Sequence, residues 1–94
     1  MSPHEAEKIQ KATALEHHQA LDALAYQVIQ GRIVTVEAFN HELSRIAEAY
    51  EVLRHHAARE LSDRVVARHN VGDFSDEMLT TVPRALRPHL GLVG

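Results

Sequence analysis

Apolar residues recur at helical spacing through the middle of the chain, and this pattern constrains the fold more than any other feature. Successive members are separated by 4, 3, 4, 3 and 4 positions, as in a helix that buries one face against another helix. The members are Phe39, Leu43, Ile46, Tyr50, Leu53 and Ala57. Leu61 and Val65 extend the pattern in steps of four. We therefore predict one long helix over about residues 35–69, with Thr35 as its N-cap.

The first 30 residues also predict a helix. Neither Gly nor Pro occurs between Pro3 and Gly31, and apolar residues recur every seven positions at Ala14, Leu21 and Val28. Ser2 is the expected N-cap, Pro3 suits the first helical position, and Gly31 can adopt the positive φ that ends many helices. We expect this helix over about residues 3–30.

The C-terminal segment predicts short, interrupted structure. Asp73 or Ser75 can cap a small helix, and Pro83 and Pro88 prevent one continuous helix. We expect a short helical extension over about residues 75–87.

The apolar residues of this segment are too many for a solvated tail. Phe74 and Leu79 are expected to cover the end of the helical pair, because they follow the long helix directly. The end of the segment lies beyond both prolines, and we predict that it forms a mobile peptide that binds a partner through Leu90, Leu92 and Val93.

Two long helices joined by a short linker form antiparallel neighbours. A turn near Arg32 pairs residues whose numbers sum to roughly 65, so Leu24 should face residues 41–43. The apolar sector of the first helix is wider than one partner helix covers. We predict a single all-α domain over residues 1–94, a long antiparallel helical hairpin with a short C-terminal helical extension, dimerising into a four-helix bundle. Its buried residues should include Leu21, Leu24, Ile46 and Leu53.

The chain is histidine-rich, with eight histidines in 94 residues. Metal ligands within one helix need i, i+3 or i, i+4 spacing, which no two of these histidines have. Adjacent helical residues point about 100° apart, so neighbouring histidines are not expected to converge. We expect solvated or hydrogen-bonded histidines and no metal site within one chain. The weak candidates for a site between chains are His17, His18, His55, His56 and His69.

Four arginines gather on the second half of the predicted long helix: Arg54, Arg59, Arg64 and Arg68. Cations are favoured near a helix C-terminus, and a basic group also suits an acidic protein surface. Glu60 and Asp63 interrupt the group, no aromatic residue is available nearby for base stacking, and the net charge is −3. Nucleic acid is therefore not the expected partner.

Several classes of function find no support in the sequence. It has no nucleophile motif and no phosphate-binding loop, so we expect neither catalysis nor a cofactor. Zero cysteines exclude disulfides and thiolate metal sites, and no apolar run is long enough to span a membrane.

The features together favour a cytoplasmic, non-catalytic protein–protein interaction module, an adaptor or inhibitor that acts through helix faces. Its partner would be another protein or a second copy of the chain. The expected partner-binding residues are Arg54, Arg59, Arg64, Arg68, Leu90, Leu92 and Val93. Two alternatives remain open: a histidine-based divalent-metal-binding protein with a site formed between chains, and a weak DNA-binding regulator.

Overall fold

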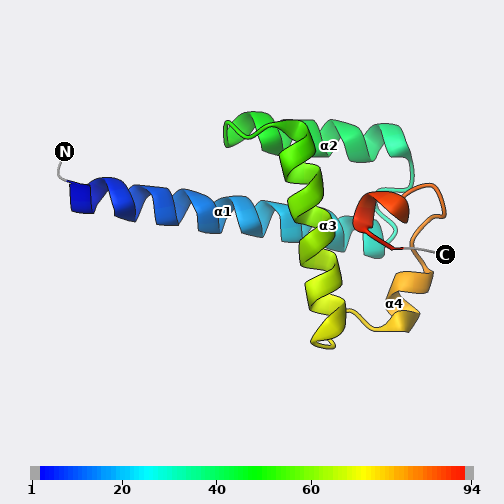
Figure 1. Ribbon diagram of the computed structural model, residues 1–94. Helices are drawn as coiled ribbons and strands as arrows, with labels where there is room; N and C mark the ends of the chain where they lie inside the picture. Colours follow the sequence, from blue (N-terminus) through cyan, green and yellow to red (C-terminus); the bar gives the residue numbers. More distant parts are fainter. Residues whose placement is uncertain (1–2, 93–94) are drawn as a thin grey trace.

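The computed structural model describes the backbone of residues 3–92 and the side chains of residues 13–92. Within this range the chain is helical and contains no strand, which confirms the all-α class. The elements are α1 (Pro3–Ile29), α2 (Val36–Ala49), α3 (Arg54–Asn70), α4 (Asp76–Thr80) and a 3-10 turn, η1 (Pro88–Leu90) (Figure 1). None of the described helices is both long and apolar enough to cross a membrane.

Helix α1 and the start of α2 lie where the local sequence signals place them. Gly31 adopts a φ of 78° and follows the last turn of α1. The Thr35 side chain caps α2 by accepting a hydrogen bond from the Ala38 N–H, at 3.1 Å. The expected N-cap of α1, Ser2, lies outside the described residues.

Helices α1 and α2 run antiparallel (Figure 1), close to the predicted register. The rings of His17 and Tyr50 pack together with their centroids 5.4 Å apart, and the two residue numbers sum to 67, near the expected 65. Leu21, Leu24 and Ile46 are buried, as predicted.

The prediction of one helix over residues 35–69 is wrong, because the helix ends in a Schellman motif. The Val52 N–H donates to the Ala47 carbonyl at 2.8 Å, and the Glu51 N–H donates to the Glu48 carbonyl at 3.2 Å. Glu51 adopts a φ of 52°, the left-handed conformation that Gly usually supplies at this position. The chain therefore turns without any Gly or Pro.

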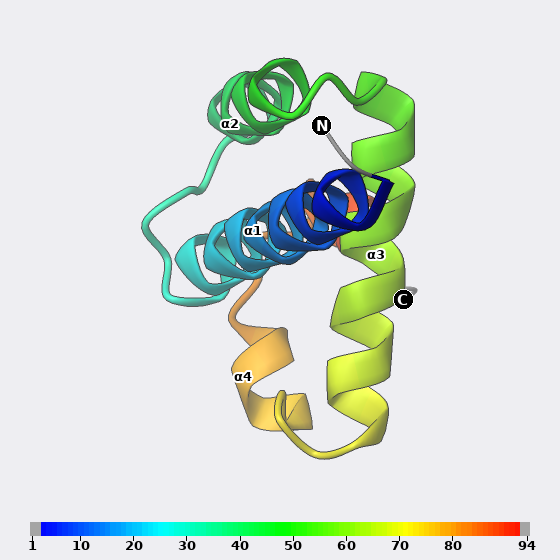
Figure 2. The ribbon, with the colours of Figure 1, turned by 90° about the vertical axis from the view of Figure 1, so that its left-hand side faces the viewer.

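The turn directs α3 across α1 and α2 instead of along α1 (Figures 1 and 2). Ala57, Leu61 and Val65 are buried in this arrangement. Leu53 lies in the turn with 67% of its surface exposed, so its predicted place in the core is wrong. Helix α3 thus covers, within one chain, apolar surface that the sequence analysis assigned to a second copy.

The C-terminal segment folds back on the helices. The Ser75 hydroxyl caps α4 by accepting from the Met78 N–H at 3.2 Å, and α4 is shorter than the predicted extension over residues 75–87. Phe74 and Leu79 are buried, as predicted.

Residues 88–92 are packed rather than mobile. Leu90 is fully buried, and η1 lies against α3. Gly91 approaches α3 so closely that an added Cβ would clash with the Ser62 hydroxyl. The prediction of a mobile peptide is therefore wrong for Leu90 and for Leu92, which is half-buried and donates its N–H to the Arg87 carbonyl at 2.9 Å. Val93 lies outside the described residues.

The molecule is elongated because of α1. Its principal extents are 48 × 29 × 19 Å and its radius of gyration is 14.4 Å, against about 12 Å for a compact domain of this length. A 27-residue helix is about 40 Å long. In Figure 1 the first half of α1 extends beyond the other described elements. Side chains 13–16 are exposed, and burial along the described part of α1 begins at His17.

Candidate functional site

A line of polar contacts joins α1 to α3. Successive contacts are one helical turn apart on each helix, and the two residues of each pair are 42 positions apart in the chain. The pairs are His18–Glu60, Asp22–Arg64 and Tyr26–Arg68. Polar side chains therefore fix the register in which α3 crosses α1.

Asp22 is the central acceptor of this line. Its Oδ1 accepts from Arg64 Nε at 2.8 Å, and its Oδ2 accepts from Arg64 Nη2 at 2.7 Å and from Arg68 Nη2 at 2.8 Å. Burial raises the pKa of the Asp22 carboxyl, but the hydrogen bonds and charges of Arg64, and then of Arg68, outweigh it and hold that pKa below its usual value. The hydrogen bond to Asp22 is also the main cause of a raised pKa at Arg64. This cluster is a structural ion pair whose groups remain charged.

Arg68 also packs against aromatic rings. Its Nη1 donates to the Tyr26 hydroxyl at 3.2 Å, and its guanidinium carbon lies 5.7 Å from the Tyr26 ring centroid and 5.8 Å from that of Phe74. Arg64 and Arg68 therefore have partners within the chain. Arg54 and Arg59, the other two predicted partner-binding arginines, are exposed.

At the other end of the line two histidines meet one carboxylate. His17 Nδ1 lies 3.1 Å from Glu60 Oε2, and His18 Nε2 lies 3.3 Å from Glu60 Oε1. His17 is only 7% exposed, and its Nε2 has no hydrogen-bond partner among the described residues. One nitrogen from each ring and one oxygen of Glu60 all lie within 4.8 Å of one another. The structure thus brings together two of the five histidine candidates, within a single chain.

Sequence reasoning treated Glu60 only as an interruption of the basic group. Ligand spacing within one helix does not indicate Glu60, because this carboxylate lies on α3, 42 positions from His18 in the chain. No local motif marks such a pairing. The signal lies in the matched four-residue steps of polar residues on α1 and α3, which become meaningful only once the two helices are known to cross.

The remaining histidine candidates are placed elsewhere. His55 and His56 are exposed at the start of α3, with their ring centroids 6.2 Å apart. His69 Nε2 lies 2.6 Å from Asp76 Oδ1, in an ion pair that joins the end of α3 to α4.

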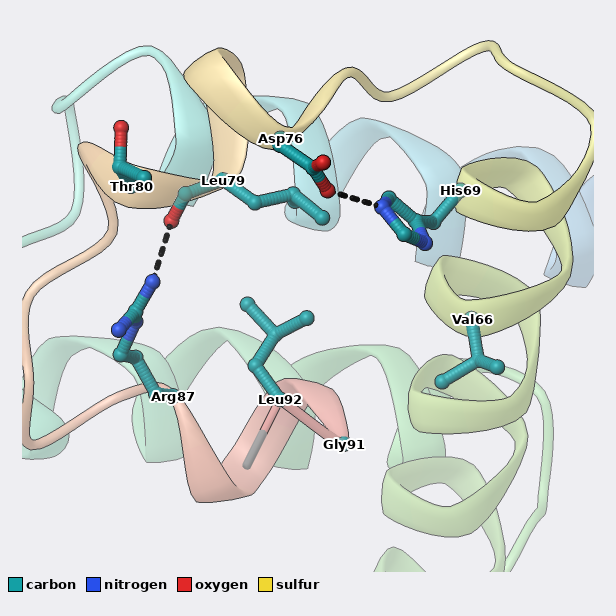
Figure 3. Close-up of a pocket in the computed structure, with 8 residues that line it drawn as sticks. All are labelled: Val66, His69, Asp76, Leu79, Thr80, Arg87, Gly91 and Leu92. Carbon is teal, nitrogen blue, oxygen red and sulfur yellow. Dashed lines mark hydrogen bonds and ion pairs between the residues drawn. The ribbon is translucent and has the colours of Figure 1, made fainter. Parts of the chain in front are cut away.

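That ion pair borders an open depression between α3, α4 and the C-terminal turn (Figure 3). On the opposite side Arg87 Nη2 donates to the Leu79 carbonyl at 3.3 Å. Val66 and Leu92 provide apolar surface, and Leu92, a predicted partner-binding residue, is half-buried there.

Comparison of this chain with protein-family models, with curated proteins and with solved structures found no match. Function must therefore be inferred from the chain's own surfaces and side-chain clusters. Two features of the described residues bear on it: the first half of α1, whose backbone projects from the other elements (Figure 1), and the cluster formed by His17, His18 and Glu60.

Proposed function

We propose that this protein is a small, non-catalytic interaction module of the cytoplasm, an adaptor or inhibitor that presents helix faces to other proteins. The proposal rests on one observation: the first half of α1 extends beyond the body of the molecule, with no other described element beside it (Figure 1).

A helical segment that projects from the body of a protein is expected to be weakly stable by itself. Isolated helices shorter than about 12–15 residues are marginal in water, because packing supplies most of the stability of helices in proteins. Leu15, on the exposed part of α1, has 58% of its surface open to solvent. A helix from a partner would bury this residue and stabilise the projecting half.

A second copy of the chain is the partner that we propose first. Two projecting halves related by a twofold axis would cover each other, so one interface would serve both copies. The sequence there carries both signs of charge, with Glu5 and Glu7 followed by Lys8 and Lys11. An antiparallel pair can place opposite charges together, which favours self-association over repulsion.

The surface beside the projecting half also suits a partner. The contact between His17 and Tyr50 holds the α2–α3 turn against α1 at the point where burial begins. Leu53 in that turn and Arg54 at the start of α3 are both exposed and offer an apolar and a basic side chain to a partner. DNA binding by the arginine group is less favoured, because Arg64 and Arg68 are engaged by Asp22.

Light scattering coupled to gel filtration, repeated over a wide range of protein concentration, tests this proposal. We expect a mass approaching twice 10.5 kDa at high concentration. Leu15→Lys should return the protein to a monomer by placing a charge in the interface. Val71→Lys is the matched control, because Val71 is an exposed apolar residue (74%) at the far end of α3. A monomer at every concentration, or equal effects of the two substitutions, would refute self-association through α1.

A further inference from the structure

We propose that His17, His18 and Glu60 form a site for one divalent transition-metal ion of the Zn²⁺ type within a single chain. The site needs no second copy, because all three ligands belong to one chain: His17 and His18 lie on α1 and Glu60 lies on α3. The spacing of the histidines alone predicts no metal site within one chain, because no two of them are three or four positions apart.

The distances are close to those that a metal site needs. Zn²⁺ lies about 2.0–2.2 Å from nitrogen and oxygen ligands, so two ligands of a tetrahedral site are roughly 3.3 Å apart. The two ring nitrogens lie 3.1 and 3.3 Å from the Glu60 oxygens. All three ligand atoms lie within 4.8 Å of one another, and the half-buried His18 ring and the Glu60 side chain can rotate to bring them closer to this geometry.

The donor set selects the kind of ion. Two imidazole nitrogens and one carboxylate oxygen suit Zn²⁺ and related transition metals. Ca²⁺ and Mg²⁺ prefer shells made of oxygen. Three protein ligands leave one position of a tetrahedral ion for water or for a small ligand.

The surroundings hold the ligands in place before an ion arrives. His17 is buried and packs against the Tyr50 ring, which limits its rotation. One helical turn away, Asp22 binds Arg64 and fixes α3 against α1, so the backbone that carries Glu60 is positioned. An ion bound here would link α1 to α3.

One feature limits the expected affinity. Binding through Nδ1 leaves the proton of His17 on Nε2, which has no hydrogen-bond partner among the described residues. Ligating histidines usually donate this second N–H to a carboxylate or carbonyl, and loss of such a partner lowers metal affinity by about 10- to 100-fold. We therefore expect weaker binding than at a structural zinc site.

Calorimetric titration of the full, tag-free chain with Zn²⁺ is the first test. We expect one ion per chain, with no change in the oligomeric mass on addition of metal. Glu60→Gln and His18→Gln should each weaken binding by at least about tenfold, because each removes one ligand. Circular dichroism establishes that the variants remain folded.

The second pair of adjacent histidines supplies the matched control. The double variant His55→Gln/His56→Gln removes two exposed histidines from α3 and should leave Zn²⁺ affinity unchanged. Because all three ligands come from one chain, the protein should bind Zn²⁺ equally well at concentrations where it is a monomer, so failure of the self-association proposal would not affect this one. Substitution with Co²⁺ adds a visible spectrum that reports four- or five-fold coordination and should change in Glu60→Gln.

Three results would overturn the site. Absence of Zn²⁺ binding would leave the cluster as an ion pair between His17, His18 and Glu60. Equal affinity of the wild type and Glu60→Gln would exclude the carboxylate as a ligand. One ion per two chains, with a doubled mass on metal addition, would support the alternative of a site formed between chains.

Discussion

Replacement of Glu51 by Gly should stabilise this protein, although the same change inside a continuous helix would destabilise it. The exposed Glu51 has a φ of 52°, and a left-handed conformation costs an L-residue roughly 1–2 kcal/mol. Gly adopts this conformation freely, but it loses about 0.5–1 kcal/mol more conformational entropy on folding. The difference predicts a gain of about 0.5–1 kcal/mol in the free energy of unfolding for Glu51→Gly.

Glu51→Ala is the matched control, because it removes the same side chain but keeps the Cβ atom. In the Schellman motif the Gly variant should be the more stable of the two by about 1 kcal/mol. Within a continuous helix the Ala variant would be the more stable by a similar amount, about 1 kcal/mol. Urea unfolding followed by circular dichroism measures both, and about 1 kcal/mol corresponds to a Tm difference of about 4–8 °C for a domain of this size. A more stable Ala variant would refute the break between α2 and α3.

Three further predictions concern burial and charge. In urea titrations, Leu53→Ala should change the free energy of unfolding by less than about 0.5 kcal/mol, because Leu53 is exposed. Leu61→Ala should lower it by about 2–5 kcal/mol, because Leu61 is buried. Equal effects of the two substitutions would contradict the turn between α2 and α3. Truncation after Arg87 removes the buried Leu90 and should lower the stability by at least about 2 kcal/mol, so an unchanged melting temperature would contradict the packing of η1. Asp22→Asn should cost about 1–3 kcal/mol at neutral pH. The native pKa of the Asp22 carboxyl lies below its ordinary value of 3.8. The charged carboxylate therefore stabilises the fold above pH 3.8, and this stabilisation is lost as the pH falls through the native pKa. The Asn variant should lack this part of the acid unfolding transition.

Features set by a few neighbouring residues could be predicted from the sequence. Thr35 and Ser75 cap helices because a short hydroxyl side chain can accept from an N–H three residues later. Gly31 ends α1 in the left-handed conformation that its lack of a side chain permits. The length of the linker then sets the antiparallel register of α1 and α2. The numbers of the contacting residues His17 and Tyr50 sum to 67, against the predicted sum of about 65.

The break at Glu51 could not be predicted in the same way. Hydrophobic periodicity reports which residues share a face if the helix continues, and the spacing from Tyr50 through Leu53 to Ala57 stays in step across the turn. The local sequence offers no Gly at the left-handed position. Tertiary packing compensates for the left-handed conformation of Glu51. Leu61 and Val65 are buried after the turn, and this burial offsets the free-energy cost of that backbone conformation.

The candidate metal site depends on this same turn. In a straight hairpin with facing numbers that sum to about 65, Glu60 would lie opposite residue 5, about 20 Å along α1 from His18. The turn instead brings His18 and Glu60 to 3.3 Å, and it brings Asp22 to Arg64 one helical turn further on. Loss of Zn²⁺ binding would therefore follow from any change that straightens α2 into α3, even with all three ligands intact. The two measurements test different things: the relative stability of the Gly and Ala variants at position 51 tests the turn itself, whereas absence of Zn²⁺ binding in the wild type would refute the metal site and leave the crossing of α3 over α1 in place, because Asp22, Arg64 and Arg68 hold it without an ion.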